Sequence, residues 1–168
     1  MSVTPDELFA FLRELGIETT TVEHPPVYTV EQARRHREGL EGGFIKNLFL
    51  RNKKGKMWLV VAEESTSINL KALGRGLGAG NLSFASPERL QRYLGVQPGA
   101  VSPFGLINDT GRLVRLVLDQ RLATLDPLNL HPLDNARTTA IARGDLFRFI
   151  EATGHVVELM DLAPYGDI

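Results

Sequence analysis

The stretch Gly95–Asp109, read GVQPGAVSPFGLIND, limits what this chain can fold into more than any other. Its two prolines and three glycines exclude a continuous helix or strand, because proline lacks the N–H and fixes φ while glycine admits unusual backbone conformations. The stretch is nevertheless rich in apolar side chains, so we expect an irregular backbone that packs on a core. The N–H and C=O groups of such a loop need partners, and a ligand is one candidate. A tightly packed connector is the alternative.

Length and composition place the chain among ordinary soluble globular proteins. Its 168 residues, 43% of them hydrophobic and 23% charged, fit one domain over residues 1–168 with a proper core. The absence of cysteine excludes a disulfide framework and a Cys-ligated metal, and no leader or membrane span is evident, so the cytoplasm is the expected compartment. A net charge of −1 means that a polyanion must be met by local patches.

The N-terminal region predicts two helices with a strand between them. Thr4 and Pro5 open the first helix and Gly16 ends it, and the β-branched run 19–23 follows as a strand. The capping-box spacing of Thr29–Gln32 predicts a second short helix to about residue 36. That helix ends in a basic cluster, which is either a solvated face or a polyanion contact: Arg34, Arg35, His36 and Arg37.

A β-hairpin is the clearest local prediction. Strands 44–51 and 57–62 flank the turn-forming run Asn52–Gly55, and WLVVA at 58–62 is apolar enough to be a central strand. On the first strand Lys46 shares a face with Phe44 and leucines, so this cation lies among apolar neighbours. It either extends to water or serves a ligand.

The rest of the chain interleaves short strands and helices without a repeat. Helices are expected at 68–74, 87–94 and 145–153, and strands at 82–85, 113–119, 138–142 and 156–159. The glycine-rich run 74–80 is expected to be a flexible connector, 126–135 to be turn-rich and the tail from Asp161 to be loose. This pattern predicts a mixed α/β domain with a curved, barrel-like mixed sheet flanked by helices.

Common catalytic constellations are absent from the sequence. The four histidines lack zinc-site spacing, thiol catalysis is excluded, no serine lies in a GxSxG turn, and nothing in the sequence pairs the aspartates. A lysine, a few neutral polar groups and an irregular backbone loop remain. Such a set suits binding of an anion and a carbonyl oxygen.

Three motifs together resemble a known family. Lys46-Asn47 on a strand, GAVSP (Gly99 to Pro103) as a G-x-x-x-P loop, and NLHPLDN before a Thr-Thr strand are similar to the YbaK/ProX aminoacyl-tRNA deacylases. These are relatives of the editing domain inserted in bacterial prolyl-tRNA synthetases, and the resemblance is strongest to the free-standing alanyl-tRNA(Pro) deacylases. It extends over nearly the whole chain. It implies the editing-domain fold and hydrolysis of a mischarged amino acid from tRNA, with no metal or other cofactor.

The resemblance also implies roles for individual residues. Lys46 is expected to hold the phosphate of the terminal adenosine, and Gly99 and Pro103 to bracket the loop that meets the aminoacyl group. His131 either lines the pocket or packs structurally against Pro132. Further substrate contacts are expected at Asn47, Ala100, Val101 and Ser102, with Val30, Ile45 and His131 as candidate pocket walls. Candidate tRNA phosphate contacts are Arg34, Arg35, Arg37, Lys53, Lys54 and Lys56.

The leading functional hypothesis is hydrolysis of the ester that links alanine to tRNA(Pro). Two alternatives stay open on the sequence: a deacylase for cysteine or another small residue, and a non-catalytic module that binds tRNA or a synthetase. Aminoacyl-tRNA is the expected partner, and prolyl-tRNA synthetase is a candidate partner.

Overall fold

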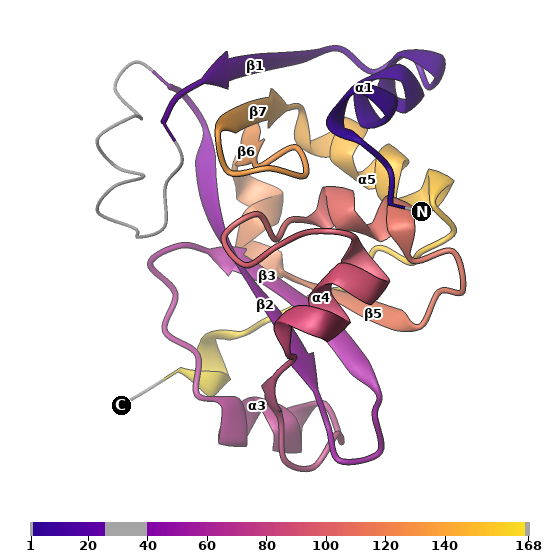
Figure 1. Ribbon diagram of the computed structural model, residues 1–168. Coiled ribbons are helices and arrows are strands. Elements are labelled where there is room, and N and C mark those ends of the chain that lie inside the picture. The colour runs from indigo at the N-terminus through magenta and orange to yellow at the C-terminus, as the bar shows by residue number, and fades with distance from the viewer. Residues whose placement is uncertain (1, 26–39, 167–168) are drawn as a thin grey trace.

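The computed structural model describes residues 2–25 and 40–166 of the chain (Figure 1). Its α-helices are α1 (Pro5–Glu14), α3 (Leu70–Gly76), α4 (Pro87–Leu94) and α5 (Arg143–Ala152). Short 3₁₀ helices are η1 (Pro103–Asn108), η2 (Gln120–Thr124) and η3 (Ala163–Tyr165). The strands are β1 (Thr19–Glu23), β2 (Gly43–Arg51), β3 (Met57–Glu63), β4 (Ser83–Phe84), β5 (Val114–Asp119), β6 (Leu128–Leu130), β7 (Arg137–Ile141) and β8 (Leu159–Met160).

The described strands form one mixed sheet in the order β1-β7-β6-β2-β3-β5-β8. β2 pairs with β3 from Ile45 to Arg51, while β6 and β4 pair with its beginning and its end. The sheet is open, with β1 and β8 as its edges, and the predicted mixed α/β fold is confirmed. Within the described residues no helix is long and apolar enough to cross a membrane.

The predicted hairpin of β2 and β3 is confirmed in type and register. Arg51 pairs with Met57 and Lys46 with Ala62, so the turn lies at Asn52–Lys56. Six of the seven residues of β3 are buried, as expected of a strand with a neighbour on each side. Asn52 stabilises the turn, because its Oδ1 accepts from the Lys56 N–H at 2.9 Å.

Two apolar cores lie on opposite faces of the sheet. The larger core receives side chains from α1, α4, α5 and η1, and the smaller one from α3 and the C-terminal segment (Figure 1). Alternation along β2 places Phe49 in the larger core and Leu50 in the smaller one. The two faces of β2 therefore meet different environments, and neighbouring site residues on this strand do so too.

Helix ends follow the predicted signals where a cap is present. Thr4 closes a capping box on α1 with Glu7, and Ser86 caps α4, which ends at Gly95 in the left-handed region at φ +65°. The helix predicted at 68–74 is present, but both of its ends lie two residues further along the chain than predicted. Asn69 caps it by accepting from the Ala72 N–H, so α3 begins at Leu70.

Three other expectations were wrong. The turn-rich stretch 126–135 contains the buried strand β6, which the sheet accepts because β2 offers it a parallel partner. The strand predicted at 156–159 is the shorter β8, which begins at Leu159. The tail from Asp161 is not loose over its described residues, since Leu162 is fully buried in the smaller core and the Tyr165 ring lies against Gly76. The predicted helix at 29–36 lies outside the described residues.

The far end of the irregular loop is fixed by a buried carboxylate. Asp109 accepts hydrogen bonds from the N–H groups of Leu113 and Val114 and from His155 Nε2 at 2.9 Å. Burial raises the pKa of Asp109, but these three donors outweigh burial and hold that pKa below its ordinary value. The ionised carboxylate thereby joins the end of η1, the start of β5 and the segment after α5.

We predict that Asp109→Asn lowers the free energy of unfolding at pH 7 by about 1–3 kcal/mol, because charge-assisted bonds are weakened at a buried site. Since the folded-state pKa lies below the unfolded one, the contribution of Asp109 is present above about pH 4 and is lost as the pH falls through the folded-state value. Urea unfolding at pH 7 and pH 3 measures this, and the difference between wild type and variant should shrink at pH 3.

Asp145→Asn is the matched control for that substitution. It removes an exposed bridge to Arg148 and should cost no more than about 1 kcal/mol. Equal destabilisation by the two variants, or a difference that does not depend on pH, would contradict the role given to Asp109.

Candidate functional site

The loop between α4 and η1 has the two properties expected from its sequence, an irregular backbone and apolar anchors. Gly99 lies at φ +93°, in the region that favours glycine, and is exposed. Ala100 on one side and Phe104 on the other are buried in the larger core. Pro103 is buried at the first position of η1. The loop is therefore held by its apolar residues while Gly99 faces outward.

Several backbone donors of this loop are unengaged. The Ala100 N–H donates to the Gln97 carbonyl at 3.0 Å, and the Phe104 N–H donates to Ser102 Oγ. The N–H groups of Gly99, Val101 and Ser102, in contrast, donate to no other described residue. Closely spaced unengaged N–H groups can stabilise negative charge on a carbonyl oxygen. Because Ser102 is fully buried, the accessible donors of this kind are the N–H groups of Gly99 and Val101.

Ser102 connects the loop to the segment after β6. Its side chain is fully buried, and its hydroxyl donates to the His131 carbonyl at 2.7 Å while accepting from the Phe104 N–H at 3.2 Å. The hydroxyl is thus engaged within the fold, so the structure gives Ser102 a positioning role. A direct contact of this side chain with substrate stays a prediction.

His131 lies in a small cluster with His24. His131 Nδ1–H donates to the Arg137 carbonyl at 2.9 Å, which fixes the orientation of the imidazole ring. The His24 ring lies edge-on to it, with centroids 6.1 Å apart, and His24 Nε2 bonds Thr138 Oγ1 at 2.8 Å. His24 had no predicted role, because 107 residues separate it from His131 and only the pairing of β1 with β7 brings them together.

Lys46 and His131 both lie just beyond the pairing of β2 with β6. Phe44 pairs in parallel with Asn129, which is the last pair of that ladder, so the segments that carry Lys46 and His131 leave the same parallel pair. Lys46 is half-buried and forms no hydrogen bond or ion pair with another described residue. As predicted, it shares a face of β2 with Leu48 and Leu50 of the smaller core. Its charge is available to a ligand.

A buried carboxylate lies on the same face, on the other side of Lys46. Lys46 pairs with Ala62, and continuing the β3–β5 register by one residue places Asp119 next to Ala62. Asp119 is fully buried, and its Oδ1 accepts from the Arg121 N–H while its Oδ2 has no partner among the described residues. Ala62 of β3, which has a small side chain, therefore lies between Lys46 on β2 and Asp119 on β5. The sequence did not pair Asp119 with anything, since this row depends on register.

Asn47 and Ile45 project to the opposite face of β2. Ile45 is half-buried against the larger core, as is Val101 of the loop. Asn47 Oδ1 is buried and has no hydrogen-bond partner among the described residues, which is costly unless a donor is supplied. Both residues are thus placed where loop and strand share a core, and their substrate contacts stay predictions.

The remaining predicted residues lie elsewhere. Lys53, Lys54 and Lys56 are exposed at the far end of the hairpin, seven or more residues from Lys46 along the chain and hence about 20 Å away. The structure therefore does not bring the hairpin lysines to the loop. Four predicted residues lie outside the described residues: Val30, Arg34, Arg35 and Arg37.

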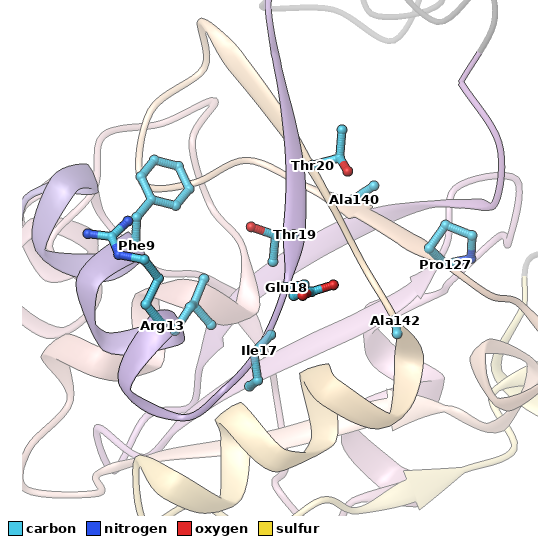
Figure 2. Close-up of a pocket in the computed structure, with 10 residues that line it drawn as sticks. Phe9, Arg13, Ile17, Glu18, Thr19, Thr20, Pro127, Ala140 and Ala142 are labelled. Carbon is cyan, nitrogen blue, oxygen red and sulfur yellow. The ribbon is translucent and has the colours of Figure 1, made fainter.

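A separate cavity of about 650 Å³ lies between α1 and the β1–β7 pair (Figure 2). Phe9 and Arg13 of α1 form one wall, and Thr19, Thr20 and residues of β7 form the other (Figure 2). None of the predicted site residues lines this cavity. Thr19 is at the opposite end of β1 from the His24 cluster, so the cavity is distinct from the candidate site.

The chain is similar to a family of known description. Residues 24–149 match the family model described as aminoacyl-tRNA editing domain. The "Prolyl-tRNA editing protein ProX" of Acetoanaerobium sticklandii is 40% identical over 156 residues, which cover 92% of this chain and 95% of that protein. The "Prolyl-tRNA synthetase associated domain-containing protein 1" of Danio rerio is 42% identical over 151 residues, or 89% of this chain and 82% of that protein.

Solved structures share the fold at lower sequence identity. A candidate trans-editing enzyme for prolyl tRNA synthetase superposes with a TM-score of 0.70 at 20% identity and covers 96% of this chain and 98% of its own. A scaffold protein used for epitope grafting superposes with a TM-score of 0.72, also at 20% identity, covering 96% of this chain and 97% of its own. At these identities the likeness is one of fold.

We predict that Gly99→Ala removes most aminoacyl-ester hydrolysis while costing only about 1–2 kcal/mol of stability, because a Cβ at φ +93° forces the backbone to shift and turns the neighbouring N–H groups away. Deacylation kinetics and urea unfolding measure the two effects. Gly111→Ala is the control, since its Cβ would meet only ordinary contacts at 3.6 Å. A Gly99 variant that unfolds early yet keeps wild-type turnover per folded molecule would show that this glycine is structural.

Proposed function

Because this chain belongs to the aminoacyl-tRNA editing domain family, we propose that it is a trans-editing hydrolase that removes alanine from mischarged tRNA(Pro). Such an enzyme is needed because the side chain of alanine is smaller than that of proline. A synthetic site built for proline cannot strongly exclude a smaller side chain, so a second site that admits only the small product corrects the error.

One observation supports the chemistry most strongly: the accessible, unengaged N–H groups of Gly99 and Val101 on a loop joined to His131. In the proposed reaction water attacks the ester carbonyl carbon, and the developing oxyanion accepts hydrogen bonds from these backbone donors. The bond from the carbonyl carbon to the ribose oxygen then breaks. Alanine leaves as the free acid, and the ribose oxygen takes a proton to regenerate the terminal hydroxyl.

Lys46 has the proposed role of holding the phosphate of the terminal adenosine. Its charge is unpaired among the described residues, and it lies on the strand that pairs with β6, the strand before His131, whose carbonyl anchors the loop. An ammonium fixed on a rigid strand orients the nucleotide relative to the loop, and orientation of this kind contributes directly to rate. The family resemblance suggests that the ribose 2′-hydroxyl positions or activates the attacking water. Prolyl-tRNA synthetase stays a candidate partner.

We predict that Lys46→Ala lowers kcat/KM for alanyl-tRNA(Pro) about a hundredfold, the equivalent of a charge-assisted contact of about 2–3 kcal/mol. Folding should change little, since no described partner loses its counter-charge. Release of labelled alanine from the tRNA measures the effect, and Lys71→Ala on the exposed face of α3 is the control. Turnover near the wild-type level in the Lys46 variant would exclude the phosphate role.

The second prediction concerns selection by size. If the pocket is a sieve, proline is excluded by steric overlap, which costs about 1–3 kcal/mol or more against a rigid wall. Ile45→Ala or Val30→Ala should then enlarge the pocket and let prolyl-tRNA or another larger ester be hydrolysed, while alanine stays a substrate. His131→Ala tests the third candidate wall.

Rates on a panel of aminoacyl-tRNAs, normalised to the folded fraction, decide this point. Val156→Ala is the control, because Val156 is 76% exposed and contacts neither core. If every trimmed variant loses alanine activity and gains no larger substrate, specific contacts select the amino acid and the steric account is wrong.

A further inference from the structure

A basic groove lies at the end of the sheet remote from the candidate site. It has a volume of about 730 Å³ and is formed by the β2–β3 turn, the glycine-rich loop after α3 and the start of β5. Figure 1 shows the hairpin turn and α3 together at the lower end of the view. Among the described residues, five cationic side chains and no carboxylate line the groove: Lys53, Lys54, Lys56, Arg112 and Arg115.

Four of these five cations have no counter-charge within the described part of the chain. Arg115 is paired with Glu158 through two hydrogen bonds, whereas Lys53, Lys54, Lys56 and Arg112 form no ion pair with another described residue. Lysines on a hairpin turn are ordinarily solvated, and singly they would carry no argument. Convergence of four unpaired cations on one concave surface is different, because the walls focus their field on whatever occupies the groove.

The walls of the groove are held together by a side-chain hydrogen bond and by close backbone packing. Asn52 is buried, and its Nδ2 donates to the Ala79 carbonyl at 3.1 Å, which joins the hairpin turn to the glycine-rich loop. That loop closes tightly on α3: a Cβ on Gly74 would lie 2.0 Å from the Gly80 carbonyl oxygen. The flexible connector predicted from the glycines is therefore wrong for this run. Gly74 allows the close packing, and Gly78 and Gly80 provide the left-handed turns of the groove wall.

Arg112 is also fixed in place. It has φ +53°, a conformation that costs a non-glycine residue energy, and its side chain lies over Gly154, where a Cβ would be 2.4 Å from Arg112 Nε. Trp58 lines the groove as well. It is 4% exposed, and its indole Nε1–H has no hydrogen-bond partner among the described residues.

We propose that this groove binds the sugar-phosphate backbone of the tRNA acceptor stem, several nucleotides away from the esterified adenosine. The proposal rests on the proposed function for the identity of its ligand. Unpaired cations suit phosphate oxygens, which carry the charge of a nucleic acid in any sequence. At about 3.4 Å per stacked nucleotide, the separation of about 20 Å from Lys46 corresponds to about six nucleotides.

Two substrates separate the groove from the reactive site: alanyl-tRNA(Pro), and the alanyl ester of the trinucleotide CCA, which is too short to reach the groove. The test variant is the double charge reversal Lys53→Glu/Lys54→Glu, with Lys71→Glu as control, since Lys71 is exposed on α3 and does not line the groove. The reversal should lower kcat/KM for the tRNA at least tenfold at low salt. The CCA ester should be hydrolysed at the wild-type rate.

Salt dependence gives a second readout. Because each phosphate that a lysine neutralises releases counterions, the double reversal should reduce the slope of log(kcat/KM) against log[salt] by about one for each phosphate that is no longer neutralised. An unchanged rate and slope on alanyl-tRNA(Pro), or an equal fall in rate on the tRNA and the CCA ester, would overturn the proposal.

Trp58 offers a third readout that does not depend on catalysis. It is the single tryptophan of the chain, so its fluorescence on titration with uncharged tRNA(Pro) reports on the groove alone. A saturable change that the double reversal abolishes supports the proposal, and no change in the wild type contradicts it. If the wild type hydrolyses neither ester, the proposed function fails, and this titration still decides whether the groove binds tRNA.

Discussion

The hydrogen bond from Ser102 Oγ to the His131 carbonyl is the contact on which the candidate site depends. It joins a loop of the larger core to the segment that leaves β6, and β6 in turn fixes the position of Lys46 through its parallel pairing with β2. One buried hydroxyl thus connects the backbone donors of the loop to the lysine. The Asp109–His155 pair holds the other end of the same loop, so its irregular backbone is fixed at both ends.

Much of this arrangement could be predicted from the sequence where the signal is local. The β2–β3 hairpin, the Thr4 capping box and the Gly95 helix end all follow from residues within a few positions of one another. The contact of His24 with His131 could not be predicted in this way, because it requires the long-range pairing of β1 with β7. Likewise the row from Lys46 through Ala62 to Asp119 depends on strand register.

Short elements and glycine runs were the other source of error. β6 has three residues between two turn-rich segments, too few for a periodic signal, and it is stabilised by strands distant in sequence. The glycine-rich run after α3 indicated flexibility, yet its glycines allow the backbone to pack closely at the basic groove. Composition alone does not distinguish a loose connector from a tight one. In the two proposals, ester hydrolysis takes place near Lys46 at one end of the hairpin, and the sugar-phosphate backbone of tRNA binds near Lys53 at the other end.

Hydrolysis measured side by side on alanyl-, cysteinyl-, seryl- and prolyl-tRNA(Pro) tests the central claim most directly. The labelled amino acid is followed on each tRNA with and without the purified chain, so spontaneous ester hydrolysis is subtracted. The proposed sieve with backbone donors predicts rapid release of alanine and no release of proline. Release from cysteinyl-tRNA(Pro) alone would contradict the specificity for alanine, and no release from any of the four would contradict the assignment as a deacylase.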